Sequence, residues 1–278
     1  MRLRQILAPL PLLFAACTGS WVGAEEPRSI LLATTTSVQD SGLLDALLPH
    51  FMKQTGIRVR VVAVGTGAAL RMGAEGNADL LLTHAPSAER ALVEDGISTR
   101  RIEFMENHFV LAGPVADPAG VGDAADILHA LRGIREAGAP FISRADDSGT
   151  NKKEKALLRA AGLDPKERWP ALTRTGSGMG LSLQVAGQRS AYILSDIGTF
   201  LAFREKTGLV ILSKPEPALR NVYSVLLLDT ERFPKLHGPE AKALAAFFGQ
   251  PKTQALIADY GRERFGRALF RPIGFTGD

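Results

Sequence analysis

Hydrophobic residues in this chain follow two periods that alternate from one end to the other. Short apolar runs of strand length, such as residues 29–33 and 57–64, are each followed by stretches with a different spacing. Between Leu43 and Met52, for example, apolar residues recur every three or four positions, as they do on one face of a helix. This alternation predicts an α/β protein in which strands and helices succeed one another along the chain.

The individual elements follow from these periods and from the glycines and prolines between them. We expect the first helix to be kinked or broken at Pro49, because proline removes a backbone donor inside a helix. Asn151 and Glu154 have the spacing of a capping box at the start of a later helix. The pattern predicts strands at 29–33, 57–64, 79–83, 102–105, 109–112, 140–143, 191–194, 210–212 and 222–228, helices at 43–55, 68–75, 87–95, 123–137, 151–161, 178–189, 196–206, 239–248 and 251–260, and helix and loop at 163–173.

The first residues have the organisation of an export signal. Two arginines within residues 1–4 precede an apolar run from Ile6 to Ala16, which is too short to span a bilayer. Residues 22–24 form a small-residue cleavage site, so we expect residues 1–24 to be a signal peptide and the mature protein to be periplasmic. The alternative is a lipid anchor on Cys17. Cys17 is the only cysteine, and cleavage after Ala24 would remove it, so a disulfide, a zinc–thiolate site and a cysteine nucleophile are not expected in the mature chain.

Composition and charge argue against several classes of function. The chain is 45% hydrophobic and 22% charged, as expected for an ordinary globular protein, and no apolar run of about 18 residues follows the leader. Removing the two arginines of the leader from the formal net charge of +4 leaves +2, too little to indicate a nucleic-acid partner. Aromatic residues make up 6%, and Trp169 is the only tryptophan after the leader, which argues against a sugar-stacking platform.

The order of the elements suggests two lobes. The composition changes at Gly113-Pro114, and the chain returns toward its first unit after about residue 200. We therefore expect residues 25–112 to form the first part of lobe 1, residues 113–198 to form lobe 2, and residues 199–278 to return to lobe 1. Two crossings between lobes make a natural hinge, which can close on a ligand. We expect the protein to be a monomer.

Three short polar loops stand between an apolar run and a helical pattern. Such a junction directs free backbone N–H groups, hydroxyls and the positive end of a helix dipole at one point. Three of them on one exported chain predict a pocket for a small anion, although each alone is also explained by helix capping, by a simple turn or by a surface ion pair. Gly176-Ser-Gly-Met-Gly180 either lines the cleft or only starts a helix. The candidate residues are Thr34, Thr35, Thr36, Ser37, Thr66 between Gly65 and Gly67, Arg144, Ser148, Gly149 and Thr150.

Two carboxylates beside the candidate arginine determine which anion fits. The Arg144 guanidinium can bind two oxygens of a dianion and stays charged. If Asp146 or Asp147 faces the pocket, hydrogen phosphate benefits, because it carries a proton that a carboxylate can accept. If both brace Arg144 or cap the following helix, the pocket offers only donors and favours fully deprotonated tungstate, molybdate or sulfate.

The sequence lacks the motifs expected of a metal-cation site or of a hydrolase with a catalytic triad. The chain has neither G-x-S-x-G nor S-x-x-K near a base, so a nucleophilic triad is not expected. We expect a binding protein and not an enzyme. An enzyme with the same fold and a ligand sensor are the alternatives. The five histidines lack H-x-x-x-H spacing, so a metal-cation site is not expected: His50, His84, His108, His129 and His237.

Several motifs follow one another in a set order after the leader. In combination, over nearly the whole mature chain, they resemble the tungstate-binding proteins of bacterial ABC importers. The resemblance implies a two-lobed class II periplasmic binding protein fold, each lobe a mixed β-sheet flanked by helices, with an oxyanion in the interlobe cleft. The motifs are Ala33-Thr-Thr-Thr-Ser37, Val61-Val-Ala-Val-Gly-Thr-Gly67, Ala78-Asp-Leu-Leu-Leu-Thr-His-Ala-Pro86, Asn107-His-Phe-Val110, Phe141-Ile-Ser-Arg-Ala-Asp-Asp-Ser-Gly-Thr150, Gly176-Ser-Gly-Met-Gly180 and Ala191-Tyr-Ile-Leu-Ser-Asp-Ile-Gly-Thr199.

The same resemblance implies the ligand, the partners and the site. The ligand is tungstate, no cofactor is needed, and the protein delivers the anion to a membrane permease and ATPase. The implied ligand residues are Thr34 to Ser37, Thr66, Arg144 and Ser148 to Thr150, with Arg144 recognising the oxyanion. The chain departs from the family pattern at His108, Asn151 and Ile197, and these departures weaken the preference for tungstate over molybdate. A receptor for molybdate, sulfate or phosphate is the alternative.

Overall fold

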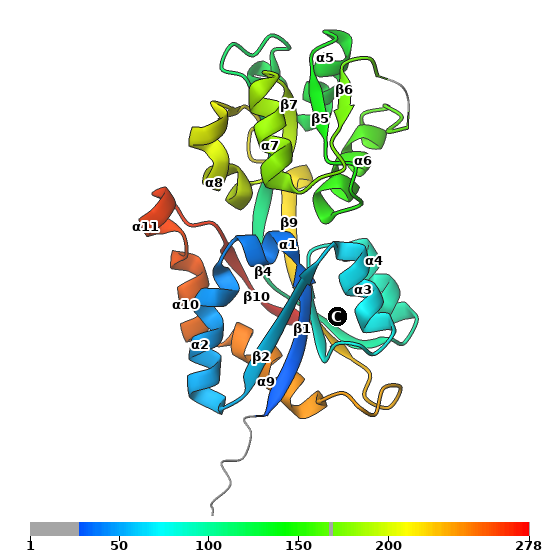
Figure 1. Ribbon diagram of the computed structural model, residues 1–278, viewed down its shortest axis with the longest axis vertical. Coiled ribbons are helices and arrows are strands. Elements are labelled where there is room, and N and C mark those ends of the chain that lie inside the picture. The colour runs from blue at the N-terminus through cyan, green and yellow to red at the C-terminus, as the bar shows by residue number, and fades with distance from the viewer. Residues whose placement is uncertain (1–27, 167–168, 278) are drawn as a thin grey trace, which may run out of the picture.

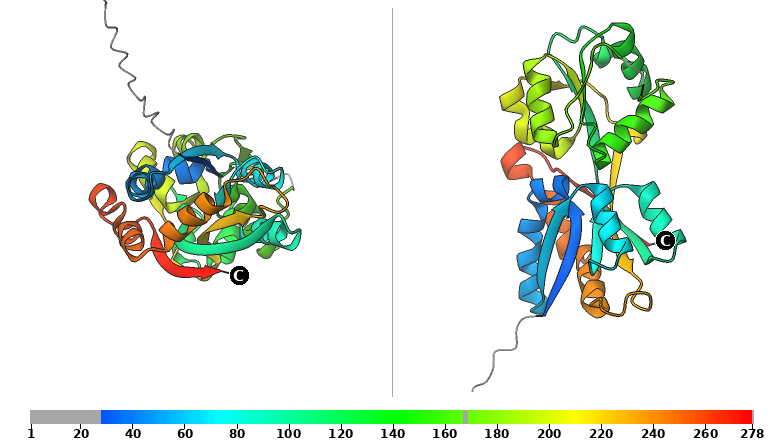
Figure 2. Two further views of the ribbon diagram at one scale, coloured as in Figure 1. Left: turned by 90° about the horizontal axis from the view of Figure 1, so that it is seen from below. Right: turned by 45° about the vertical axis from the view of Figure 1, so that its right-hand side comes forward.

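The protein is elongated, with two lobes joined by a narrow waist (Figure 1 and Figure 2). The structure is a computed structural model that describes residues 28–166 and 169–277, so the predicted leader lies outside the described residues. Two long strands run side by side through the waist and connect the lobes (Figure 1). None of the described helices has both the length and the apolar character that crossing a membrane requires.

Lobe 1 is built on a mixed sheet with the strand order β2-β1-β3-β9-β4, and β10 pairs with the far side of β4. The first three strands are parallel, whereas β9 runs antiparallel to both β3 and β4. Helices cover both faces of the sheet, and apolar residues of α2, α9 and the strands form its largest core. The strands of this lobe are β1 (Ser29–Thr35), β2 (Arg58–Val64), β3 (Leu80–Thr83), β4 (Ser98–Gly113), β9 (Arg220–Leu228) and β10 (Arg271–Gly277), and its helices are α1 (Thr36–Asp40), α2 (Leu43–Thr55), α3 (Thr66–Ala74), α4 (Pro86–Glu94), α9 (Gly238–Gly249), α10 (Pro251–Asp259) and α11 (Arg262–Phe265).

Lobe 2 repeats this design on a smaller scale. The second half of β4 pairs with β7, and β5 and β6 extend the sheet in parallel with β7. One core lies between the sheet and α5 and α6, and a second lies under α7 and α8. Its elements are β5 (Phe141–Ser143), β6 (Leu172–Arg174), β7 (Tyr192–Asp196), β8 (Val210–Ile211), α5 (Ile127–Glu136), α6 (Gly149–Ala160), α7 (Met179–Gln188), α8 (Ile197–Thr207) and the 3-10 turns η1 (Val121–Asp123) and η2 (Pro217–Leu219).

The crossings between lobes differ from those predicted. The expected strands 102–105 and 109–112 are one continuous strand, β4, which pairs with β9 up to His108 and with β7 from Phe109 onward. The chain returns to lobe 1 at η2 and β9 rather than near residue 199. The reason is that Ile197 and Phe200 of α8 are buried in the core of lobe 2, against residues of β4 and β7.

Several helix boundaries also differ from the expected ones. The capping box at Asn151 is wrong, because Ser148 caps α6 instead and its hydroxyl accepts the Asn151 amide at 3.3 Å. Asp126 caps α5, so the helix expected from residue 123 begins at Ile127. Helix α2 runs through Pro49 without a break. The described part of residues 163–173 is not helical, and its end enters β6.

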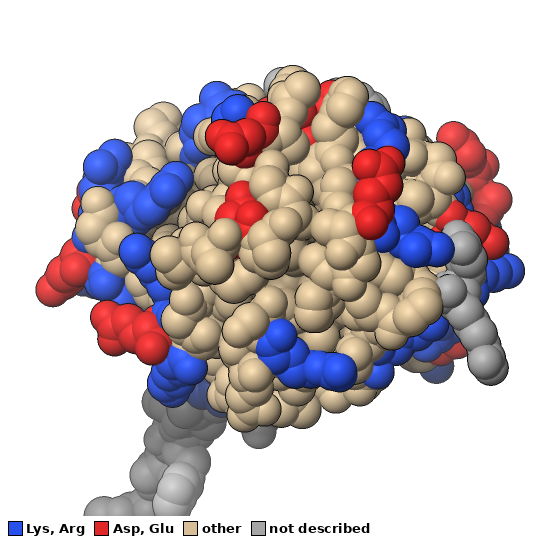
Figure 3. Space-filling view, turned by 90° about the horizontal axis from the view of Figure 1, so that it is seen from above, with Lys and Arg blue, Asp and Glu red and all other residues tan. Residues whose placement is uncertain are grey.

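The outer end of lobe 2 carries charges of both signs. Figure 3 shows Lys and Arg side chains interspersed with Asp and Glu around a largely uncharged centre. A nucleic-acid-binding face has a continuous basic stripe instead. This face therefore shows no electrostatic signature of a polyanionic partner.

Candidate functional site

The ends of the parallel strands in the two lobes face each other across a cleft. In lobe 1, β1, β2 and β3 end at the edge nearest the waist, and α1, α3 and α4 begin there. In lobe 2, β5 ends before Arg144, and α6 begins shortly afterwards. Ligands of α/β proteins bind outside the carboxyl ends of parallel strands, because loops and helix N-termini converge there.

Glycines show how closely the predicted loops approach one another. A methyl group placed on Gly149 of lobe 2 would lie 2.8 Å from His84 Cε1 and 3.3 Å from Thr66 Oγ1 of lobe 1. A methyl group on Gly67 would lie 3.7 Å from Asp147 Oδ2 across the same cleft. The second and third polar loops are therefore in contact, and a side chain at Gly149 would obstruct that contact. We call the cluster of Ser37, Thr66, His84, Arg144 and Gly149 the interlobe site.

The first loop reaches this site through Ser37. The Ser37 hydroxyl lies 3.0 Å from His84 Nε2 and 3.1 Å from Thr35 Oγ1. Thr35 caps α1, with its hydroxyl accepting the Val38 amide at 3.3 Å. The Thr34 hydroxyl is buried and donates to the Leu82 carbonyl at 2.8 Å, so this predicted ligand side chain is already used within the sheet.

Thr36, Gly149 and Thr150 lie in the first turns of helices that begin at the cleft. Thr36 is exposed at the first position of α1. Gly149 and Thr150 are buried in the first turn of the twelve-residue helix α6. The first amides of a helix have no intrahelical acceptor, and the helix dipole makes that end positive. Donors from both lobes therefore point into the cleft.

Two buried donors in the interlobe site lack a partner among the described residues. The Thr66 side chain is 1% exposed and its Oγ1 makes no hydrogen bond. Arg144 is 4% exposed, and its Nε likewise has no hydrogen-bond partner among the described residues. Buried polar atoms without a partner are uncommon, and a water, ion or ligand that binds there is one explanation for them.

The two carboxylates beside Arg144, those of Asp146 and Asp147, both have partners within the protein. Asp146 Oδ2 accepts from Arg144 Nη2 at 2.5 Å, while its Oδ1 accepts from the Ser148 amide at 3.2 Å and the Ser148 hydroxyl at 2.6 Å. Asp147 is exposed and pairs with Lys152 Nζ at 2.5 Å. Ala145 and Asp147 have positive φ angles of 51° and 57°, a strained backbone that wraps the loop around Asp146.

His84 is the main site residue that sequence reasoning missed. It was one of five scattered histidines, yet it is buried beside Ser37 and Gly149. Its Nδ1 lies 2.9 Å from Asn221 Oδ1, and burial lowers the pKa of its imidazole. The available signal was its position directly after Thr83, the last residue of β3, where the predicted loops also follow parallel strands.

Asp196 is a second residue that the sequence did not single out. It is buried, caps α8 by accepting the Thr199 amide at 2.9 Å, and leaves Oδ2 without a partner among the described residues. Burial and the Asp196 charge raise the pKa of Asp40, while Arg144 lowers it. Asp40, Asp196 and Arg144 therefore interact electrostatically around the same cleft.

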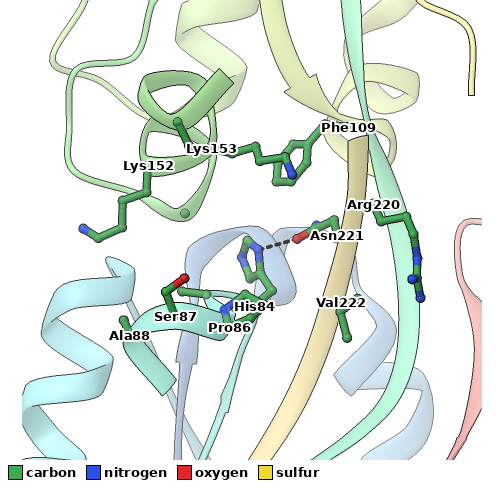
Figure 4. Close-up of a pocket in the computed structure, with 13 residues that line it drawn as sticks. His84, Pro86, Ser87, Ala88, Phe109, Lys152, Lys153, Arg220, Asn221 and Val222 are labelled. Carbon is green, nitrogen blue, oxygen red and sulfur yellow. Dashed lines mark hydrogen bonds between the residues drawn. The ribbon is translucent and has the colours of Figure 1, made fainter. Parts of the chain in front are cut away.

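A cavity of about 350 Å³ adjoins the interlobe site (Figure 4). It lies between the start of α4, the waist strands and α6, and His84 and Gly149 form part of its wall. Lys152, Lys153 and Arg220 also line it; Lys152 pairs with Asp147 and Arg220 with Glu106, whereas Lys153 forms no ion pair among the described residues. Positive charge lining a cleft concentrates anions near it. In the described part of the chain, no group of three His, Cys, Asp or Glu side chains could hold a metal ion.

Comparisons with known proteins agree with this architecture. Residues 22–251 match the PBP superfamily domain. The tungstate-binding protein TupA of Peptoclostridium acidaminophilum is 41% identical over 283 residues, covering 98% of this chain and 98% of that protein. These relatives are named as binding proteins, in agreement with the expectation of a non-enzymatic protein.

Two solved structures share the fold. The tungstate-binding protein TupA of Desulfovibrio alaskensis G20 has a TM-score of 0.78 and 39% identity, covering 89% of this chain and 99% of that chain. The structure titled the tungstate ABC transporter from Geobacter sulfurreducens has a TM-score of 0.75 and 42% identity, covering 84% and 98%. The predicted periplasmic binding protein fold is thus confirmed. Given this identity over nearly its whole length, the chain belongs to the family of the tungstate-binding protein TupA, within the PBP superfamily.

Proposed function

We propose that this protein captures tungstate in the interlobe site and delivers it to the permease and ATPase of an ABC importer. The observation that carries this proposal is the pair of unpaired buried donors, Thr66 Oγ1 and Arg144 Nε, beside the N-terminus of α6. A tetrahedral dianion supplies the acceptors that both groups lack. The names of the relatives support tungstate as that dianion.

The two carboxylates beside Arg144 favour a fully deprotonated anion. Every short contact of Asp146 is with Arg144 or Ser148, and Asp147 pairs with Lys152. Both carboxylates thus have donors of the protein itself as partners, and this favours a ligand that needs no acceptor. The proposed ligand groups are the backbone and hydroxyls of Thr35 to Ser37, the Thr66 hydroxyl, the Arg144 guanidinium and the first turn of α6 from Ser148 to Thr150, with Thr34 holding the first loop in place.

Phosphate is a second candidate, and one observation favours it. Asp196 is buried near this cleft and its Oδ2 has no partner among the described residues. A carboxylate facing the ligand would accept the proton of hydrogen phosphate but would repel tungstate. Titration with both anions separates the two candidates.

Calorimetric titration of exhaustively dialysed protein tests the proposal. Tungstate should bind tightly with one-to-one stoichiometry, molybdate should bind comparably, and sulfate and phosphate should bind far more weakly. Binding of phosphate but not tungstate would assign the second candidate. Absence of binding by all four anions to protein shown to be folded by circular dichroism would overturn the oxyanion assignment.

The cellular setting is also a proposal. Export followed by cleavage after Ala24 would release the protein into the periplasm, and lipidation of Cys17 is the alternative. Mass spectrometry of protein recovered from the envelope distinguishes a chain beginning at Glu25 from a lipidated one. We propose that the receptor acts as a monomer, which light scattering of the purified protein would test.

A further inference from the structure

A chain of hydrogen bonds runs from the waist strands to the interlobe site. Asn107 of β4 and Asn221 of β9 face each other in register, and Asn221 Nδ2 donates to Asn107 Oδ1 at 2.8 Å and to the Tyr223 hydroxyl at 2.9 Å. With both donors of the amide used, Asn221 Oδ1 remains to face His84 Nδ1 at 2.9 Å. Ser37 completes the chain at His84 Nε2.

This chain fixes which nitrogen of His84 carries the proton. A carbonyl oxygen can only accept, so Nδ1 must be the N–H that donates to Asn221. A buried imidazole is stable in its neutral form, and its other nitrogen, Nε2, then has only a lone pair. The single proton of the Ser37 hydroxyl is therefore donated to His84 rather than to the cleft.

That arrangement conflicts with a deprotonated ligand. Tungstate offers only acceptors, and Ser37, with its proton committed to His84, offers only lone pairs to it. Two acceptors facing each other in a dehydrated site repel. A proton added at His84 Nε2 removes the conflict, because Nε2 then donates to Ser37 Oγ and the Ser37 proton turns to the anion.

We propose that His84 takes up one proton from solvent when a deprotonated oxyanion binds, and thereby converts Ser37 from an acceptor into a donor. The overall step joins the protein, the dianion and one proton, and no covalent bond to the ligand forms. His84 is a positioning residue here, since it acts on the ligand through Ser37. This inference rests on the proposed function.

The charges around His84 fit such an uptake. Burial, as the largest cause, and the Arg144 charge lower its pKa, whereas the Asn221 hydrogen bond, Asp196 and Glu89 raise it. A dianion beside Arg144 offsets the effect of that cation and adds negative charge of its own. The Tyr223 ring stacks on His84 at a centroid distance of 4.9 Å, an arrangement that also favours a cation. Lys152, Lys153 and Arg220 line the adjoining cavity, where Lys152 pairs with Asp147 and Arg220 pairs with Glu106.

Calorimetry in two buffers of different ionisation enthalpy, for example Tris and HEPES, counts the protons directly. At pH values where tungstate is monomeric and deprotonated, we expect an uptake approaching one proton per tungstate bound. The affinity should fall by up to about tenfold per pH unit as the pH rises, because protonation and binding are linked. Tungstate binding without proton exchange would overturn the inference while leaving the proposed function intact.

Matched variants assign the proton to His84. His84→Gln keeps an amide that can donate to Ser37 but cannot titrate, so it should bind tungstate with no proton uptake and little pH dependence. His108→Gln is the control, because His108 is a partly buried histidine of β4 that does not contact Ser37. It should retain the uptake. Wild-type uptake in folded His84→Gln protein would contradict the assignment.

A direct measurement covers the case in which His84→Gln does not fold. Nuclear magnetic resonance of wild-type protein with labelled histidine distinguishes neutral imidazole from imidazolium by the nitrogen shifts. Addition of tungstate should shift one histidine to the imidazolium state. If every histidine keeps its charge state on saturation with tungstate, the inference is wrong.

Discussion

Removal of the Arg144 side chain should weaken tungstate binding far more than it affects folding. The guanidinium is buried, its Nη2 bonds Asp146 at 2.5 Å, and its Nε points at no partner among the described residues. Truncating one member of a buried hydrogen-bonded charge pair costs about 2–5 kcal/mol of binding energy. Arg144→Ala should therefore raise the Kd for tungstate by about 30-fold to several thousand-fold.

The fold should tolerate this change. Asp146 keeps its two contacts with Ser148, and its side chain is partly exposed, so solvent can stabilise the freed carboxylate oxygen. Calorimetric titration measures the affinity, and urea unfolding measures the stability. Arg159→Ala is the control, since Arg159 is exposed in the last turn of α6 and its loss changes the net charge of the protein by the same amount. A Kd for Arg144→Ala within about threefold of wild type would refute the reasoning.

Three further substitutions test other parts of the account. Gly149→Ala places a methyl group 2.8 Å from His84 Cε1. This overlap should cost about 1–3 kcal/mol, and only when the lobes are closed. The Kd for tungstate should therefore rise, while the free energy of unfolding in urea should not change. Burial raises the pKa of Glu154 from 4.5 to about 7, so the folded state holds an extra proton between these values and loses about 3 kcal/mol of stability as the pH rises through them. Glu154→Gln does not titrate, and its free energy of unfolding should lack this decline; an identical pH profile for both proteins would refute the assignment. Glu89 is a buried counter-ion of Arg101 at 2.8 Å, and Glu89→Gln should lower the free energy of unfolding by about 3 kcal/mol or more in urea, whereas a loss below about 1 kcal/mol would contradict the role of this ion pair.

Periodicity was enough to predict the elements that carry the loops. The strands β1, β2 and β5, which end at or just before the three loops, and the helices after them have simple apolar patterns. Parallel pairing brings the strand ends within each lobe to one edge. Because each lobe presents that edge to the other, residues 112 positions apart in sequence, Ser37 and Gly149, both lie beside His84 at one site. The α/β class and the three-loop grouping were therefore accessible without coordinates.

The remaining features depend on tertiary contacts. The expected break within β4 follows from the polar residues Glu106 to His108, yet they lie in the waist, where Asn107 pairs with Asn221 of β9. Whether Ser148 or Asn151 caps α6 depends on the positive φ angles of the preceding loop. His84 was missed because its role requires two partners, Ser37 and Asn221, that are distant in sequence.

The most direct test of the interlobe site is to locate the anion itself. Diffraction from crystals grown with tungstate, measured on both sides of a tungsten absorption edge, gives an anomalous peak at each bound tungsten atom. We predict one strong peak between the lobes, with its oxygens within hydrogen-bond distance of Thr66 Oγ1 and Arg144 Nε, beside the first turn of α6. A peak in the adjoining cavity or on the outer surface, with Thr66 Oγ1 and Arg144 Nε still without a partner among the described residues, would contradict the account.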